Sequence, residues 1–146
     1  MRAKILSASA GSGKTYRLAY KYVHDTIKYF YEKPYLYRAI LAVTFTNKAT
    51  EEMKSRILKE INDIVQSPAK SSYLKDLKRD TALTEQEIIS RAKGILSRIL
   101  HDYSRFTILT IDKFFQRILR AFIKELGIDL NYNIELETNN ILSLST

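Results

Sequence analysis

The sequence predicts an α/β fold in which short parallel strands alternate with flanking helices. Three apolar runs of strand length, at residues 4–7, 39–44 and 106–111, are each followed by apolar residues at helical spacing. Such alternation of strand and helix favours a parallel sheet, because each helix returns the chain to the same edge. With 146 residues, 45% of them hydrophobic, one packed domain is expected.

The first half of the chain predicts two strand and helix pairs. After the strand at residues 4–7, the first helix should end before Pro34, because a residue that precedes proline is disfavoured in the α region. Residues 39–44, apolar except for Thr44, are then typical of a buried parallel strand. The second helix should run from Lys48 to the break at Ser67-Pro68. Buried positions of the two helices are expected at Ala19, Val23, Ile27, Phe30, Met53, Ile57, Ile61 and Ile64.

The second half begins with a polar, lysine-rich stretch, residues 67–84, whose weak periodicity predicts a surface excursion with at most one short helix. Thr84 and Glu87 fit a capping box, which starts a helix with buried Ile88, Ala92, Ile95 and Ile99. A third strand is expected at residues 106–111, followed by a helix that Gly127 ends. That helix carries Phe114, Phe115, Ile118, Leu119, Phe122 and Leu126, and residues 131–136 suggest a fourth strand.

Charge and composition narrow the function classes. Lys and Arg number 24 against 16 Asp and Glu, so the formal charge is +8, which suits solubility and also a polyanionic partner. There is no cysteine, and His24 and His101 lie far apart, so no zinc site is expected. No apolar run approaches the length of a membrane span, and a cytoplasmic protein without membrane attachment is expected. The helical spacing of most of the 16 Tyr and Phe residues favours core packing over base stacking.

A glycine-containing loop between the first strand and the first helix predicts phosphate binding. It matches the phosphate-loop pattern except that alanine takes the first glycine position. In this context backbone N–H groups and the positive helix end converge on one anion. The nucleotide-binding residues would be Ala8, Ser9, Ala10, Gly11, Ser12, Gly13, Lys14 and Thr15. Lys14 would contact the β and γ phosphates of ATP, and Thr15 would bind Mg²⁺. The alternative is a turn that happens to precede Lys-Thr.

The segment Ile40-Leu41-Ala42-Val43-Thr44-Phe45-Thr46-Asn47-Lys48-Ala49-Thr50-Glu51-Glu52-Met53-Lys54-Ser55-Arg56-Ile57 resembles motif Ia of superfamily 1A helicases. In that family this strand-to-helix turn holds single-stranded DNA. The resemblance therefore implies DNA-binding roles for Thr44, Phe45, Thr46 and Asn47, with hydroxyls and helix N-terminal amides on phosphates and the aromatic ring near a base. The alternative is that Phe45 belongs to the core and Thr46 only caps the helix.

The segment Arg105-Phe106-Thr107-Ile108-Leu109-Thr110-Ile111-Asp112-Lys113-Phe114-Phe115-Gln116-Arg117-Ile118-Leu119-Arg120 resembles motif Ib of the same family. There a threonine at the strand end contacts DNA phosphate, and Thr110 is the matching position. Many members carry histidine where Asp112 stands, so Asp112 is better explained as the N-cap of the next helix. Lys113, Arg117 and Arg120 follow on that helix, where exposed basic residues are usually solvated.

Together with Ser7-Ala8-Ser9-Ala10-Gly11 and Ile99-Leu100-His101-Asp102-Tyr103-Ser104-Arg105-Phe106, these motifs resemble the RecB/AddA-like branch of helicase-nucleases, relatives of the UvrD and Rep helicases. The resemblance implies that residues 1–146 form the N-terminal part of a RecA-like P-loop NTPase lobe, called 1A. Residues 67–104 would be a short helical insertion of the 1B type between motifs Ia and Ib. The longer parent would move 3′ to 5′ on single-stranded DNA. A nuclease domain would follow in the parent, and a second helicase-nuclease subunit would be its partner.

The catalytic machinery is expected to be incomplete in these residues. The family's Walker B motif, an Asp-Glu pair, should follow motif Ib, and no such pair occurs before Thr146. We therefore expect this chain alone to bind ATP weakly and to hydrolyse it negligibly. Unpaired edges of a partial sheet would favour self-association. Two other readings remain open, a non-catalytic DNA-binding module and a small P-loop kinase, although no phosphate-covering lid is visible.

Overall fold

The computed structural model describes residues 13–127, so the strands expected at residues 4–7 and 131–136 lie outside the described part. The chain divides into two compact units, residues 1–112 and residues 113–146, and each is considered by itself. The helices are α1 (Lys14–Lys28), α2 (Leu36–Ala39), α3 (Asn47–Gln66), α4 (Leu74–Thr81), α5 (Glu85–His101) and α6 (Ile111–Glu125). The strands are β1 (Ala42–Thr44) and β2 (Ile108–Thr110), and 3₁₀ turns occur at Pro68–Lys70 and Tyr103–Arg105.

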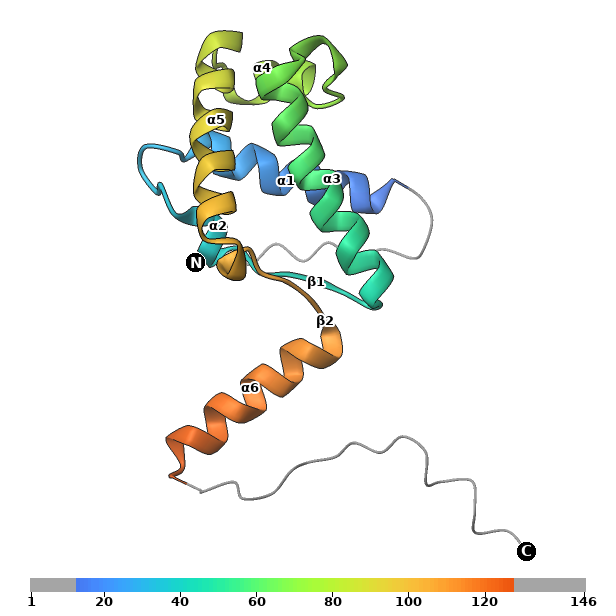
Figure 1. The fold of residues 1–146 in the computed structure, drawn as a ribbon, viewed down its shortest axis with the longest axis vertical. Coiled ribbons are helices and arrows are strands. Elements are labelled where there is room, and N and C mark those ends of the chain that lie inside the picture. The colour runs from blue at the N-terminus through green and yellow to red at the C-terminus, as the bar shows by residue number, and fades with distance from the viewer. Residues whose placement is uncertain (1–12, 128–146) are drawn as a thin grey trace, which may run out of the picture. The chain divides into compact units, whose positions relative to one another are not determined.

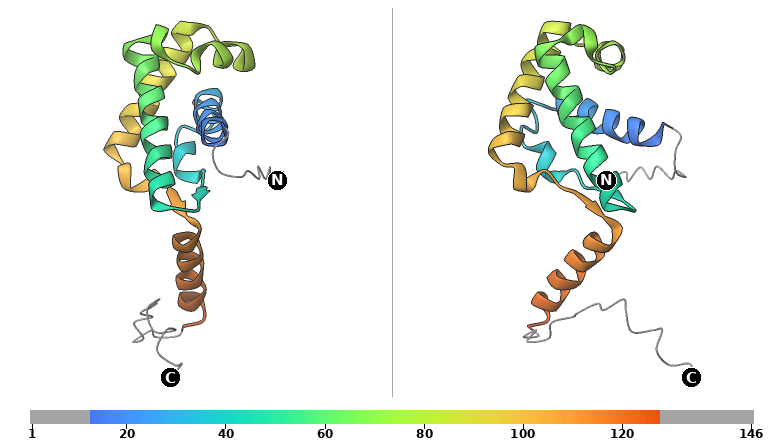
Figure 2. Two further views of the ribbon diagram at one scale, coloured as in Figure 1. Left: turned by 90° about the vertical axis from the view of Figure 1, so that its right-hand side faces the viewer. Right: turned by 45° about the vertical axis from the view of Figure 1, so that its right-hand side comes forward.

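The predicted α/β class holds in part. β1 and β2 pair in parallel, with Ala42 opposite Ile108 and Thr44 opposite Thr110, which confirms the predicted direction. The described residues are nevertheless mostly helical, and their sheet has only these two strands. In Figure 1, α3 and α5 lie side by side and α1 runs across them, and the two views of Figure 2 agree. Within residues 13–127, no helix is long and apolar enough to cross a membrane.

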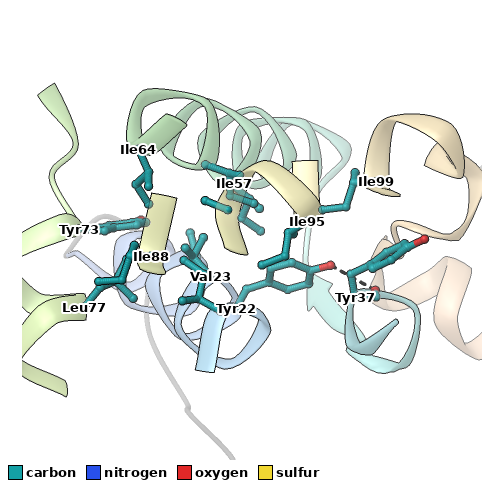
Figure 3. Packing of buried hydrophobic residues seen from close by; sticks show 14 of the residues in the cluster. Tyr22, Val23, Tyr37, Ile57, Ile64, Tyr73, Leu77, Ile88, Ile95 and Ile99 are labelled. Atoms are coloured by element: carbon teal, nitrogen blue, oxygen red, sulfur yellow. Dashed lines mark hydrogen bonds between the residues drawn. The ribbon is translucent and has the colours of Figure 1, made fainter. Parts of the chain in front are cut away.

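One hydrophobic core joins the helices of the first unit. It is built from α1, α3, α4 and α5, whose buried side chains interdigitate in Figure 3. All the predicted buried positions of α1, α3 and α5 are in it or packed against it. The core members are Ala19, Tyr22, Val23, Ile27, Tyr37, Met53, Ile57, Ile61, Ile64, Tyr73, Leu74, Leu77, Ile88, Ala92, Ile95, Ile99, Phe106 and Ile108.

The first helix ends earlier than its apolar spacing suggests. It stops at Lys28, before Pro34 as predicted, but Phe30 lies beyond it. The guanidinium of Arg91, from α5, donates to the carbonyl oxygens of Ile27 and Lys28 at 3.1 and 3.2 Å. These bonds satisfy acceptors that a helix C-terminus leaves open. Phe30 instead packs on Gly94 of α5, where a Cβ would lie 2.6 Å from the phenyl Cζ.

The strand expected at residues 39–44 is shorter than predicted, because its first residue is helical and residues 40 and 41 belong to neither a helix nor a strand. Ala39 closes α2, and β1 begins at Ala42. The helical turn places the Tyr37 ring in the core, where the Tyr22 hydroxyl donates to the Tyr37 carbonyl at 3.1 Å. Tertiary packing of an aromatic ring thus overrides the local preference of the apolar run for a strand.

The excursion expected at residues 67–84 is a packed part of the fold. The single short helix predicted there is present as α4. However, Tyr73, Leu74 and Leu77 are buried in the common core. The surface prediction was therefore wrong, because three apolar side chains in a lysine-rich stretch give too weak a periodicity to be recognised.

The third strand is also shorter than the apolar run that predicted it. Residues 108–110 form β2, and α6 begins at Ile111. Asp112 consequently lies inside the first turn of α6, so its prediction as the N-cap was wrong. An acidic residue there still interacts favourably with the positive helix end. α6 ends at Glu125, and Gly127 follows with a φ of 65°, which confirms the predicted glycine stop.

The capping box of α5 is confirmed and gives a stability prediction. The Thr84 Oγ1 accepts from the Glu87 N–H, and the Glu87 carboxylate accepts from the Thr84 N–H at 2.8 Å. We expect Thr84→Ala to lower the free energy of unfolding by about 1 kcal/mol, because the Glu87 N–H at the start of α5 loses its hydroxyl acceptor. Urea unfolding followed by circular dichroism would measure it.

Ser97→Ala, at an exposed position inside α5, is the control and should leave stability unchanged or slightly raised. The Thr84 bonds hold the pKa of Glu87 below its ordinary value. The carboxylate's contribution is therefore present above the ordinary Glu pKa and is lost as the pH falls through the lowered one. A Thr84→Ala penalty no greater than that of Ser97→Ala would contradict the capping assignment.

Candidate nucleotide and nucleic-acid site

Three residues of the predicted phosphate loop lie in the described part, and Ala8, Ser9, Ala10, Gly11 and Ser12 lie outside it. Gly13 precedes the first residue of α1 with φ 61° and ψ 6°, a left-handed conformation that glycine adopts without strain. Its carbonyl accepts from the Arg17 N–H at 3.0 Å, which starts the helix. Lys14 and Thr15 are the first two helical residues and are half-buried.

This arrangement is suited to an anion. The first N–H groups of a helix have no partner within the helix, and its N-terminus carries partial positive charge. A lysine and a threonine at that end add an ammonium group and a hydroxyl. The ammonium group can donate hydrogen bonds to the phosphate oxygens of ATP, and the hydroxyl oxygen can be a ligand of Mg²⁺. The residues present at Lys14 and Thr15 therefore fit Mg²⁺ with ATP.

The turn between β1 and α3 is held together by threonine hydroxyls. Thr44 Oγ1 lies 2.6 Å from Thr50 Oγ1 and donates to the Thr46 carbonyl at 3.2 Å. Thr50 Oγ1 donates to the same carbonyl at 3.1 Å. The turn is thus fixed from both sides, by the last residue of β1 and by the first turn of α3.

Thr46 is the N-cap of α3, because its Oγ1 accepts from the Ala49 N–H at 3.0 Å. The capping role considered from the sequence is confirmed. It leaves the hydroxyl hydrogen of this exposed side chain available for a further acceptor. Asn47 is the first residue of α3 and is also exposed.

Phe45, between Thr44 and Thr46, is 80% exposed. The alternative that placed Phe45 in the core is therefore wrong for the described part of the chain. Burial of a phenylalanine side chain is normally favourable by about 2 kcal/mol. A phenylalanine ring that a hydrogen-bonded turn keeps exposed therefore points to a binding role. The turn presents a flat aromatic surface beside polar groups and helix N-terminal amides, a combination suited to a base and its phosphate.

Thr110 ends β2 directly opposite Thr44, so both threonines lie at the carboxyl ends of parallel strands. Only 5% of Thr110 is exposed. A hydroxyl so covered has little surface for a phosphate. The structure therefore places the two predicted DNA-binding threonines together, but with unequal access.

The cations of the first turns of α3 are partly neutralised by neighbours. Lys48 lies 4.0 Å from a Glu52 oxygen, and Lys54 lies 3.7 Å from a Glu51 oxygen. These exposed pairs contribute little to stability. They do reduce the local positive charge, so attraction of nucleic acid by this face depends less on charge than the net +8 suggests.

Sequence reasoning missed a polar cluster beside the first turn of α1. Glu60 of α3 is 7% exposed and accepts from Ser71 Oγ, Ser72 Oγ and Ser72 N at 3.2, 2.6 and 3.2 Å. Buried carboxylates are rare unless they are hydrogen-bonded in this way. The adjacent serines in the sequence were a weak signal for this cluster, because nothing pointed to their partner.

Comparison with known proteins gives the family. The UvrD/REP helicase N-terminal domain matches residues 2–145. RecB of the RecBCD enzyme is 34% identical in Buchnera aphidicola, covering 80% of this chain, and 31% identical in Haemophilus influenzae, covering 94%. The AddA protein of the ATP-dependent helicase/nuclease of Exiguobacterium sibiricum is 30% identical over 94% of this chain.

These matches cover only 10%, 12% and 10% of the relatives' own lengths, so the chain spans about a tenth of each. No solved structure matched. The relatives carry the names that the motifs suggested, which confirms the resemblance to UvrD-like helicases of the RecB/AddA branch. The chain belongs to the UvrD/REP helicase N-terminal domain family.

Proposed function

We propose that this chain is the ATP-binding and single-stranded DNA-binding part of an ATP-dependent 3′ to 5′ DNA helicase of the RecB/AddA type, acting in repair and recombination. Family membership supports the helicase assignment. The observation that carries the DNA-binding part is the exposure of Phe45 on a turn fixed by threonine hydroxyls. A fold alone does not specify function, whereas such a site does.

The nucleotide would bind at the N-terminus of α1. Lys14 would contact its β and γ phosphates, Thr15 would bind its Mg²⁺, and Ala8, Ser9, Ala10, Gly11, Ser12 and Gly13 would complete the loop. Bound ATP with Mg²⁺ would supply a phosphoryl group whose transfer to water releases free energy.

Single-stranded DNA would bind at the turn after β1. The Phe45 ring would stack on a base, while the Thr46 hydroxyl, Asn47 and the first amides of α3 would contact phosphate oxygens. Thr44 and Thr110 would bind or support the same backbone at the strand ends, and the burial of Thr110 favours support. This division assigns base contact to one exposed ring and phosphate contact to a helix N-terminus.

The remaining assignments concern the parent protein. We propose that residues 67–104 correspond to the helical 1B insertion of the family. In this chain α4 and α5 share one core with α1 and α3. A second helicase-nuclease polypeptide is proposed as a partner, since two relatives are named subunits of the RecBCD enzyme. A nuclease domain elsewhere in the parent and self-association of this chain are further proposals.

Phe45→Ala tests the DNA-binding proposal. We expect the dissociation constant for single-stranded DNA to rise about five-fold or more, because stacking on an aromatic ring contributes roughly 1–3 kcal/mol per base. The free energy of unfolding should change by less than about 0.5 kcal/mol, since the ring is exposed. Fluorescence anisotropy with a labelled oligothymidine at several salt concentrations would measure the first quantity, and urea unfolding the second.

Tyr31→Ala is the matched control, because Tyr31 is also strongly exposed and lies in the loop after α1. It should leave DNA binding within about two-fold of the wild type, an estimate for a residue without base contact. Equal loss in both variants would mean that any exposed ring contributes, and the motif Ia turn would lose its special role. No loss in Phe45→Ala would remove the stacking assignment.

A further inference from the structure

The first turn of α1 is joined to the turn before α4 by two tyrosines in reciprocal contact. Tyr16 follows Thr15 directly, and its hydroxyl donates to the Ser72 carbonyl at 3.1 Å. In return, the Tyr73 hydroxyl donates to the Tyr16 carbonyl at 3.1 Å. The two rings meet edge to face with centroids 4.9 Å apart, a favourable geometry for aromatic pairs. We refer to this pair as the Tyr16–Tyr73 contact.

The contact is rigid on the side of residue 73. Tyr73 is fully buried, and its N–H donates to Ser71 Oγ at 3.2 Å. Ser71 and Ser72 are in turn bonded to the buried Glu60 carboxylate. Because Glu60 lies in the C-terminal half of α3, the position of Tyr73 is set by a long helix and not by a loose loop.

A further bond holds the next turn of α1 to α4. The Tyr20 hydroxyl donates to a carboxylate oxygen of Asp80 at 2.6 Å, and its ring packs edge to face on Tyr73. Burial raises the pKa of both the Tyr20 and the Tyr73 hydroxyls above the ordinary tyrosine value. Both hydroxyls therefore stay protonated at neutral pH and keep their role as donors.

We propose that Tyr73 is a positioning residue for the nucleotide, since it fixes the first turn of α1, from which Lys14 and Thr15 project. The inference rests on the proposed nucleotide site and adds that residues 60 and 71–73, outside the phosphate loop, set its geometry. A helix N-terminus binds phosphate well only when its amides and side chains are held in place beforehand, because misplacement by a fraction of an ångström weakens every contact at once.

Tyr73→Phe tests the proposal, because it removes one hydroxyl and keeps the ring. The matched control is Tyr22→Phe. Tyr22 is also a buried tyrosine, and its hydroxyl also donates to a backbone carbonyl at 3.1 Å, that of Tyr37. Both variants should lose a similar amount of stability. Of the two hydroxyls, that of Tyr73 bonds to the first turn of α1 and that of Tyr22 does not. The loss of one such bond corresponds to about a five-fold change in an equilibrium constant.

Two measurements on the 146-residue chain decide the matter. In the first, Tyr73→Phe should raise the dissociation constant of a fluorescent ATP analogue with Mg²⁺ about five-fold, with single-stranded DNA binding unchanged, and Tyr22→Phe should leave both as in the wild type. In the second, amide hydrogen exchange at Arg17, whose N–H is bonded to Gly13, should be faster in Tyr73→Phe and unchanged in Tyr22→Phe.

Nucleotide affinity equal in Tyr73→Phe and wild type, or reduced equally in both variants, would overturn the positioning role. Unchanged exchange at Arg17 in Tyr73→Phe would overturn it even if the wild-type chain bound too little nucleotide to measure. The failure of the proposed function is distinguishable, because it would appear as nucleotide binding by the wild type that Lys14→Ala does not weaken. Faster exchange together with weaker nucleotide binding in Tyr73→Phe alone supports the inference.

Discussion

Lys14→Ala is expected to weaken the binding of ATP with Mg²⁺ by about 100-fold, because an ammonium group at the N-terminus of α1 would contribute roughly 3 kcal/mol to phosphate binding. Lys14 is the first residue of α1, directly after Gly13 in its left-handed conformation. Isothermal titration calorimetry or displacement of a fluorescent ATP analogue would measure the change. DNA binding in the absence of nucleotide should be unchanged.

The control for this variant is Lys28→Ala, in the last turn of the same helix. It removes the same charge from the opposite end and should leave ATP binding unchanged. If neither Lys14→Ala nor the wild type binds ATP while both bind single-stranded DNA, the chain would act as a DNA-binding module without a nucleotide site. Measurable and equal ATP affinity in the two would contradict the role of Lys14. Weaker binding in both lysine variants would indicate a general charge effect of the whole helix.

Ile61→Ala should lower the free energy of unfolding by about 3 kcal/mol. Ile61 has no exposed surface and lies on α3 in the core shared by α1, α4 and α5. The substitution removes buried apolar surface and leaves a cavity that a close-packed interior cannot fill. Because a domain of this size is stable by only about 5–15 kcal/mol, the loss is a large share. Urea unfolding, followed by circular dichroism, would measure it.

Leu100→Ala provides the comparison, since Leu100 is 61% exposed on α5. Its free energy of unfolding should differ from that of the wild type by less than about 0.5 kcal/mol. A small effect of Ile61→Ala, comparable with that of Leu100→Ala, would mean that α3 is not packed as described. Binding assays of other variants are best interpreted after this comparison, because they presuppose an intact core.

The parts of the fold that the sequence predicted well are those with strong local signals. α3 and α5 have regular apolar spacing and clear ends, the threonine cap at Thr46 and the capping box at Thr84 among them. Gly127 ends α6 for an equally local reason, its positive φ. Such features depend on neighbours in the chain, and a sequence displays those neighbours directly.

The parts of the fold that the sequence predicted poorly depend on contacts with residues far away along the chain. Ala39 ends a helix, although a strand was expected to begin there, because Tyr37, two residues earlier, is drawn into the core beside Tyr22. Residues 71–73 are fixed because Glu60 lies beside them. The lengths of β1 and β2 were overestimated, since an apolar run predicts burial without saying how much of it pairs.

The candidate site shows the same division. The residue types at Lys14, Thr15 and the motif Ia turn were identified from the sequence, and the capping role of Thr46 was foreseen. The sequence left the exposure of Phe45 open between base contact and core packing, and the burial of Thr110 was not foreseen, because a sequence does not show which side chain a turn presents. The tyrosines divide similarly, with Tyr22, Tyr37 and Tyr73 in the core and Tyr31 and Tyr35 outside it.

The direct pairing of Thr44 with Thr110 has a consequence for how the chain folds. The two strands are joined by a connection that holds α3, α4 and α5, so their few hydrogen bonds must close a very long loop. Loop closure of this kind is entropically costly and slow, whereas helices and their contacts with sequence neighbours form early. We therefore expect the sheet to assemble late, after the helical core, so that the strand ends come into alignment only once most of the native surface is buried.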